Sequence, residues 1–196
     1  MGQNESQLDS EAISELSGET VFVDDELKQA YIGFMNDYPD GKMTADQLKE
    51  VYKKLSPKSD PSDFVEYVFR SFDSNGDGTI DFKEFIIALS VTRRGGSTKK
   101  KLQWIFSVYD LDSNGFITKN EMTEVLASIY KMSKKPMGYS ANKDLSPEQR
   151  VEKIYDLMDK DGDENLSLNE FADGMKNDPS VEALISFSLT DSHTYF

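Results

Sequence analysis

Cysteine is absent from this chain of 196 residues, and histidine occurs only once, at His193. Without thiols there is no disulfide framework and no cysteine nucleophile, and a single histidine leaves little for acid–base catalysis. We therefore do not expect an enzyme. No run of about 18 apolar residues occurs, so no segment is expected to span a membrane. The first residues are polar and acidic, unlike a secretory signal, which favours a cytoplasmic protein.

Basic side chains are few, with 22 Lys and Arg against 36 Asp and Glu and a net charge of −14. A nucleic-acid groove needs a positive footprint, so no nucleic-acid partner is expected. Much of the acidity is local. Three segments of twelve residues, 73–84, 110–121 and 159–170, together hold twelve carboxylates and three lysines.

These three segments repeat one pattern of oxygen-bearing side chains. Each has Asp or Asn at positions 1, 3 and 5, an aliphatic residue at position 8 and Glu at position 12. This is the spacing of an EF-hand calcium loop, in which alternate side chains, the carbonyl of position 7 and a bidentate Glu surround the ion. The predicted ligands are Asp73, Asn75, Asp77, Thr79, Asp81, Glu84, Asp110, Asp112, Asn114, Phe116, Glu121, Asp159, Asp161, Asp163, Asn165 and Glu170.

The three loops are not expected to bind equally. Loops 73–84 and 110–121 fill every ligand position and should bind calcium at about 10⁻⁷–10⁻⁵ M, the range of sensors. Loop 159–170 carries Glu164 at position 6, where glycine is usual because the backbone takes a positive φ. We expect this loop to bind more weakly or to accept magnesium in competition, although a relic turn is the alternative. The sequence therefore predicts that the protein binds two to three calcium ions.

Apolar residues at helical spacing flank each loop, so each loop lies between two amphipathic helices. EF-hands pair through their position-8 residues, and three loops therefore predict a fourth, which we place at residues 36–47. It keeps Gly41 and Met43, but Tyr38 holds position 3 beside Pro39 and Gln47 replaces the Glu, so it should not bind calcium. The predicted fold is all-α: four EF-hand helix–loop–helix units in two pairs, with short β-bridges between paired loops.

The expected organisation has five parts. A leader (1–22) precedes an N-terminal pair (23–94), whose first hand is cryptic and whose second is competent. The two glycines near residue 95 predict a linker (95–100) before the C-terminal pair (101–178) and a tail segment (179–196).

The leader carries a pattern for lipid attachment. Gly2 follows the initiator Met, with Ser6 at the required spacing, which matches N-myristoylation; the alternative is an unmodified acidic leader. A single acyl chain supports only reversible membrane binding, so a second signal is usually needed. Two basic groups are candidates for this signal, Lys53, Lys54 and Lys58 in one and Lys99–Lys101 in the other, although a solvated helix face is the commoner explanation for either group.

Taken together, the lipidation pattern, the ligand-poor first hand and the three intact hands resemble the neuronal calcium sensor family. The most family-like segments are 69–73, 81–89, 101–104 and 109–112. Tyr38 stands where that family usually has cysteine, and Ala30 where it often has tryptophan. The resemblance implies a calcium–myristoyl switch that extrudes the lipid and bares a hydrophobic groove. The groove residues would be Tyr31, Phe34, Leu48, Tyr52, Leu55, Phe82, Phe85 and Leu89.

The resulting prediction is a calcium sensor that regulates target proteins at membranes. Its partners would be an amphipathic target helix in the groove and a membrane reached through the myristoyl group, with the protein a monomer or weak dimer. We expect it in the cytoplasm, with reversible association with the cytosolic face of membranes. Two alternatives stay open: a cytosolic calcium buffer without a target, and an obligate calcium-binding regulatory subunit of an enzyme.

Overall fold

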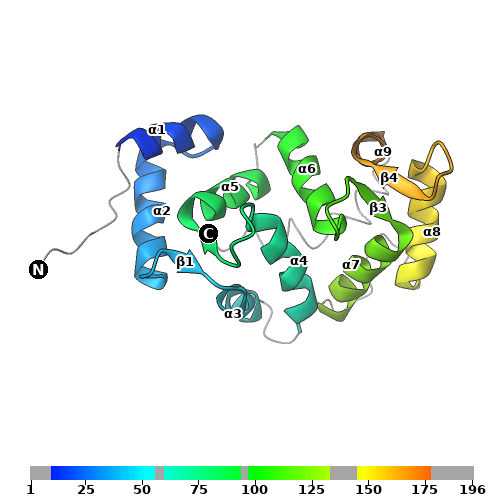
Figure 1. The fold of residues 1–196 in the computed structure, drawn as a ribbon, viewed down its shortest axis with the longest axis horizontal. Coiled ribbons are helices and arrows are strands. Elements are labelled where there is room, and N and C mark those ends of the chain that lie inside the picture. The colour runs from blue at the N-terminus through cyan, green and yellow to red at the C-terminus, as the bar shows by residue number, and fades with distance from the viewer. Residues whose placement is uncertain (1–9, 56–59, 94–96, 133–144, 178–196) are drawn as a thin grey trace, which may run out of the picture.

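The computed structural model describes residues 10–55, 60–93, 97–132 and 145–177. Within these residues the chain forms helices joined by short loops, with two small antiparallel sheets (Figure 1). This confirms the predicted all-α fold. The elements are α1 (Ser10–Glu19), α2 (Asp24–Asp37), β1 (Lys42–Met43), α3 (Ala45–Leu55), α4 (Ser62–Phe72), β2 (Ile80–Asp81), α5 (Phe82–Thr92), α6 (Thr98–Tyr109), β3 (Phe116–Thr118), α7 (Lys119–Met132), α8 (Pro147–Met158), β4 (Asn165–Ser167) and α9 (Leu168–Asn177).

The helices begin where the sequence supplies caps. The Asp81 carboxylate accepts a hydrogen bond from the Glu84 amide, and the Glu84 carboxylate accepts one from the Asp81 amide; this reciprocal cap starts α5. Ser146 and Gln149 make the same arrangement at the start of α8, where Pro147 occupies the first turn. The glutamates at position 12 of the three ligand-rich loops make such caps with position 9, so each of them also helps to start the helix that follows its loop.

Each pair of hands is joined by a two-stranded sheet between its loops. Met43 lies opposite Ile80 in β1 and β2, and Ile117 lies opposite Leu166 in β3 and β4. All four residues hold position 8 of their loops, and each is at most 2% exposed. The predicted bridges are confirmed, including the one made by the cryptic hand.

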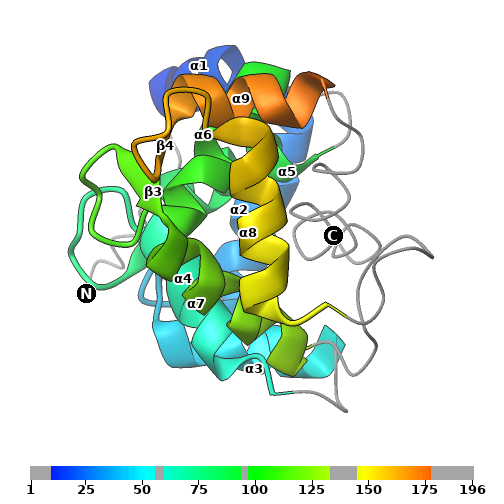
Figure 2. The same cartoon turned by 90° about the vertical axis from the view of Figure 1, so that its right-hand side faces the viewer.

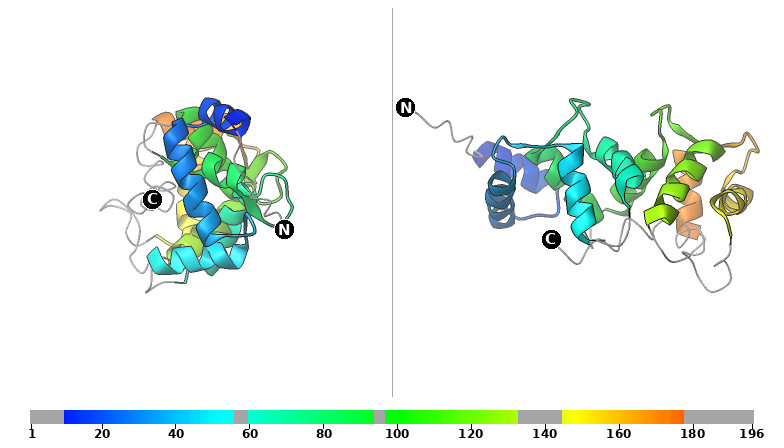
Figure 3. Two further views of the ribbon diagram at one scale, coloured as in Figure 1. Left: turned by 90° about the vertical axis from the view of Figure 1, so that its left-hand side faces the viewer. Right: turned by 90° about the horizontal axis from the view of Figure 1, so that it is seen from below.

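The two pairs lie next to each other along the long axis of the molecule (Figures 1 and 3). Helices α7, α8 and α9 form the far end of the second pair (Figure 2). The pairs meet where α4 of the first packs against α6 and α7 of the second. One hydrophobic core runs through both pairs, so the two pairs pack against each other directly.

The expected linker 95–100 is shorter in the structure. Thr98 already lies in α6, because the Ser97 hydroxyl accepts a hydrogen bond from the Lys100 amide and caps the helix. Residues 95 and 96, most of the segment between α7 and α8, and the expected tail 179–196 lie outside the described residues. Of the leader, α1 is described, and Ile13 and Leu16 are buried against α2 and α5.

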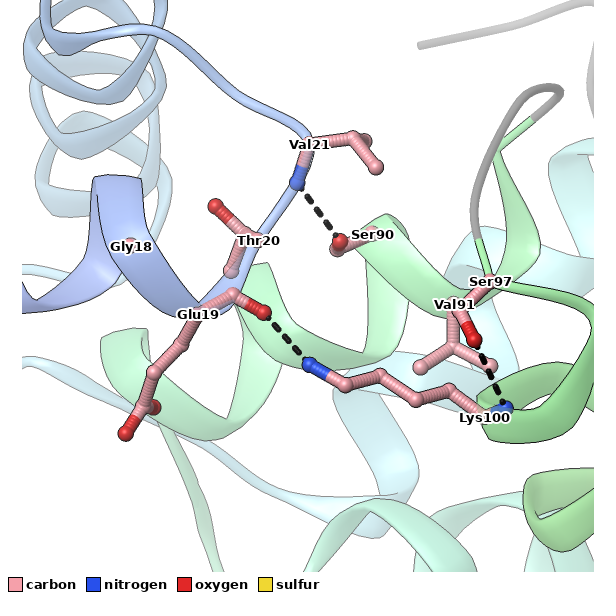
Figure 4. Close-up of a pocket in the computed structure, with 8 residues that line it drawn as sticks. All are labelled: Gly18, Glu19, Thr20, Val21, Ser90, Val91, Ser97 and Lys100. Carbon is pink, nitrogen blue, oxygen red and sulfur yellow. Dashed lines mark hydrogen bonds between the residues drawn. The ribbon is translucent and has the colours of Figure 1, made fainter.

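Lys100 shows what holds the leader in place. Its ammonium donates to the carbonyl of Glu19 at the end of α1, 2.8 Å away, and the Val21 amide donates to the Ser90 hydroxyl (Figure 4). These contacts border a small cleft of about 210 Å³. The middle lysine of the 99–101 cluster is thus engaged in capping a helix C-terminus, where a cation is stabilising.

Candidate calcium-binding loops

The three ligand-rich loops share one backbone course. In each, positions 4 and 6 have positive φ, which makes the tight turns that point alternate side chains inward. Gly76 and Gly78 hold these positions in loop 73–84, with φ of 69° and 80°. The other loops each place a residue with a side chain at one of them: Ser113 at position 4 (58°) and Glu164 at position 6 (63°). The expectation that Glu164 must adopt a positive φ is confirmed.

The glutamate at position 12 closes each loop in the same way. One oxygen of Glu121 accepts from the Leu111 amide at 2.8 Å, and the other accepts from the amide of Thr118 at 2.8 Å. Glu84 and Glu170 bridge position 2 and position 9 of their loops in the same manner. A carboxylate that joins both ends of a loop is placed to bind an ion with both oxygens.

The aspartate at position 1 faces this glutamate from the other side of each loop. Asp73, Asp110 and Asp159 each accept a hydrogen bond from the position-6 amide, at 2.9, 3.0 and 3.1 Å. The side chains at positions 3 and 5 accept from the backbone two residues further on. Backbone amides therefore orient these side-chain oxygens within each loop.

Carboxylates converge in two of the loops. Oxygens of Asp110, Asp112 and Glu121 lie within 4.8 Å of one another, as do oxygens of Asp159, Asp161 and Glu170. Burial raises the pKa of Glu170, but hydrogen bonds from Ser167 and Lys160 outweigh it and bring the pKa below its ordinary value. The converging donor atoms in both loops are oxygens, which are the ligands that calcium and magnesium both take in proteins.

Loop 73–84 differs because a lysine reaches it from the cryptic hand. Lys42 lies 3.0 Å from the carboxylate of Asp77, the position-5 residue. Hydrogen bonds from Thr79 and from Lys42 hold the pKa of Asp77 below its ordinary value. A calcium ion that binds Asp77 must therefore share the Asp77 carboxylate with the Lys42 ammonium or displace that ammonium.

The cryptic hand keeps the framework of a calcium loop without its ligands. Gly41 has φ of 72° at position 6, and the Gln47 side chain accepts from Thr44 at position 9, as the glutamates do elsewhere. Tyr38 instead packs its ring against Phe34, with centroids 5.0 Å apart. Position 3 thus contributes to the core rather than to a metal site.

The predicted groove residues gather in the first pair. The rings of Phe34 and Phe82 lie 5.7 Å apart, and Phe85 lies 5.1 Å from Phe34. Phe34, Leu48 and Phe82 are buried, while Tyr31, Tyr52, Phe85 and Leu89 are half-buried. All seven side chains belong to the hydrophobic core or pack against it, and the rings of Tyr31, Phe34, Phe82 and Phe85 contact one another. The Leu55 side chain and Gly2 lie outside the described residues.

Sequence reasoning missed three cations that touch these loops: Lys42, Arg70 and Lys119. Lys119 contacts Glu164 of the neighbouring loop at 3.7 Å and Glu152 at 3.1 Å. The pairing of loops would have suggested Lys42, because it lies opposite Asp81 in the bridge. Arg70 gave no local signal, because its contacts lie 37 to 41 residues away.

Comparisons with known proteins agree with this geometry. The profile of the EF-hand domain pair matches residues 39–90 and 99–176. Human recoverin (Homo sapiens) is 41% identical over 95% of this chain and 94% of its own length. Neuronal calcium sensor 1 of Lymnaea stagnalis is 41% identical over 98% of both chains, and visinin of Gallus gallus is 36% identical over 95% of this chain and 98% of its own length. The chain therefore belongs to the neuronal calcium sensor family of EF-hand proteins.

Proposed function

We propose that this protein binds calcium in loops 73–84, 110–121 and 159–170 and uses the ions to regulate target proteins at membranes. The observation that carries the proposal is the shared hydrogen-bond pattern, in which one Glu bridges both ends of each loop. The position-12 glutamates lie in the first turn of helices that help to form the core. An ion that shifts a glutamate would therefore also shift the packing of that helix.

The aromatic interior of the first pair is the proposed target groove. The Phe34 ring packs against the rings of Phe82 and Phe85 on α5, and α5 begins directly after Asp81. Reorientation of α5 by the ion would separate these rings and expose them to an amphipathic helix. The proposed lipid on Gly2 occupies the same apolar interior before calcium arrives, and is extruded afterwards.

Membrane attachment in this proposal depends on the lipid. None of the helices in the described parts of the chain has the length and apolar character needed to cross a bilayer. One myristoyl chain gives only marginal membrane affinity, so hiding that chain inside the protein is enough to release the protein from the membrane.

Sedimentation with anionic liposomes tests the switch directly. The myristoylated protein, its lipid verified by mass, is expected to pellet in calcium and to stay in the supernatant in chelator. Gly2→Ala, which cannot be acylated, should stay in the supernatant under both conditions. Equal pelleting in calcium and chelator would overturn the extrusion mechanism.

The groove has its own test in the protein without lipid. Calcium should increase the fluorescence of a hydrophobic dye, and a variant with Glu84, Glu121 and Glu170 all changed to Gln should show no increase. Calcium uptake measured by calorimetry without any dye response would instead identify a calcium buffer.

A further inference from the structure

Arg70 extends from the first pair of hands into a calcium loop of the second. It lies in the last turn of α4, three residues before Asp73 at position 1 of loop 73–84. Its guanidinium donates to the carbonyls of Ser107 and Asp110, each 3.2 Å away, and to the carbonyl of Leu111. Asp110 and Leu111 are positions 1 and 2 of loop 110–121.

The contact has a clear chemical basis. Helix α6 ends at Tyr109, and the last carbonyls of a helix have no partner within the helix and carry partial negative charge. A planar guanidinium has five N–H donors in a fixed arrangement, so it can bind several such carbonyls at once. The half-buried Arg70 thus caps α6 from a different EF-hand pair.

Leu111 connects this cap to the metal site. Its carbonyl accepts from Arg70, while its amide donates to the Glu121 carboxylate at 2.8 Å. Arg70, which caps α6, and Glu121, the predicted bidentate ligand, therefore both bind the backbone of Leu111. A shift of Arg70 changes the position of Leu111 and, through it, of Glu121.

Neighbouring contacts also pack the C-terminal end of α4 against α6. The Trp104 indole donates to the Ser71 hydroxyl at 3.1 Å, and its ring stacks on Phe72 with centroids 5.6 Å apart. Residues 70–72 therefore all contact α6, directly before the loop that begins at Asp73. An ion bound to Asp73 fixes the same end of α4 that carries Arg70.

We propose that Arg70 is a positioning residue that couples calcium binding in loops 73–84 and 110–121. Filling of loop 73–84 orders the end of α4, and Arg70 then holds Asp110 and Leu111 in the arrangement that the second ion needs. Thermodynamic linkage makes the effect reciprocal, so filling of loop 110–121 raises the affinity of loop 73–84 by the same factor. This inference rests on the proposed calcium binding by both loops.

Amide resonances of Gly78 and Gly115 report the two loops separately, because each donates to the position-1 carboxylate of its own loop. Calcium is titrated into the full chain while both resonances are followed by NMR. The affinity of loop 73–84 is measured with Glu121 intact and with Glu121→Gln, and the affinity of loop 110–121 with Glu84 intact and with Glu84→Gln. Both ratios measure the same coupling.

In the protein with Arg70 the ratio should be at least about fivefold in both directions. Arg70→Met keeps the aliphatic stem but removes every donor, and should reduce the ratio to within about twofold of unity. Arg70→Lys keeps the charge but loses the planar group, and should at least halve the ratio; it decides the question if Arg70→Met does not fold. Tyr67→Phe removes a different hydrogen bond between the two pairs, from the Tyr67 hydroxyl on α4 to the Glu124 carboxylate on α7, and should leave the ratio unchanged.

Each result has one meaning. Absence of calcium binding in the unaltered protein would overturn the proposed function itself. Calcium binding by both loops with a ratio near unity, or a ratio that Arg70→Met and Arg70→Lys leave intact, would overturn only the role of Arg70. Loss of coupling in Tyr67→Phe would assign the effect to the packed interface as a whole and would also overturn it.

Discussion

The first EF-hand pair joins a loop without ligands to a loop with them, whereas the second pair joins two loops that both carry ligands. The bridges are nevertheless alike, with position-8 residues opposite each other and buried in both pairs. In the first pair, Lys42 of the cryptic loop contacts Asp77, a predicted ligand of the partner loop. In the second pair, Lys119 contacts Glu164 of the partner loop, which is not a predicted ligand. Loop pairing in this chain therefore does not require a full set of ligand-type side chains in both loops.

The first prediction concerns the structural value of the cryptic hand. Met43→Ala and Leu166→Ala each remove a buried position-8 side chain, and each should lower the free energy of unfolding by about 2–5 kcal/mol. Urea unfolding in chelator, followed by Trp104 fluorescence, measures both. If Met43→Ala has no measurable cost while Leu166→Ala does, the cryptic hand is not a structural partner.

The second prediction exchanges the position-12 residues within the first pair. Glu84→Gln should weaken calcium binding in loop 73–84 by about 100-fold, because it removes a charge and a bidentate ligand. The reverse change, Gln47→Glu, should create no new site, since Tyr38 and Pro39 remain. Calorimetry gives the stoichiometry of both variants, and an additional ion bound by Gln47→Glu would contradict our description of the cryptic hand.

The third prediction compares two strained residues in the second pair. Glu164→Gly should raise the free energy of unfolding in chelator by about 1 kcal/mol, because glycine adopts positive φ without steric cost. Ser113→Gly is the matched control, since it relieves similar strain without removing a charge. Thermal unfolding checks both, and destabilisation by Glu164→Gly would mean that its contact with Lys119 outweighs the strain.

The smallest expected effect belongs to Lys42. Lys42→Met should strengthen calcium binding in loop 73–84 by about two- to fivefold, because Asp77 no longer shares its carboxylate with an exposed ammonium. Lys28→Met makes the same change in net charge at a helix position paired with Asp25, away from the loops. An equal effect of the two variants would show that only overall charge matters.

Much of the fold followed from local patterns. The spacing of Asp73, Asp77 and Glu84 predicted a loop between helices, and Met43 and Ile80 predicted the bridge that the structure confirms. Within the expected linker 95–100, Thr98 already lies in α6, because the Ser97 hydroxyl caps this helix and the adjacent glycines do not reveal that cap. The positive φ of Glu164 followed from its position in the motif.

The sequence by itself determined which oxygens gather in each loop, because a motif of twelve residues closes on itself and needs no distant partner. Only the tertiary structure decided which cations meet those oxygens and which residues join the two pairs. Lys42 reaches Asp77 across a bridge, and Arg70 reaches the carbonyl of Asp110 across a helix interface. Such contacts depend on how helices pack, and packing is set by the whole core rather than by any short pattern.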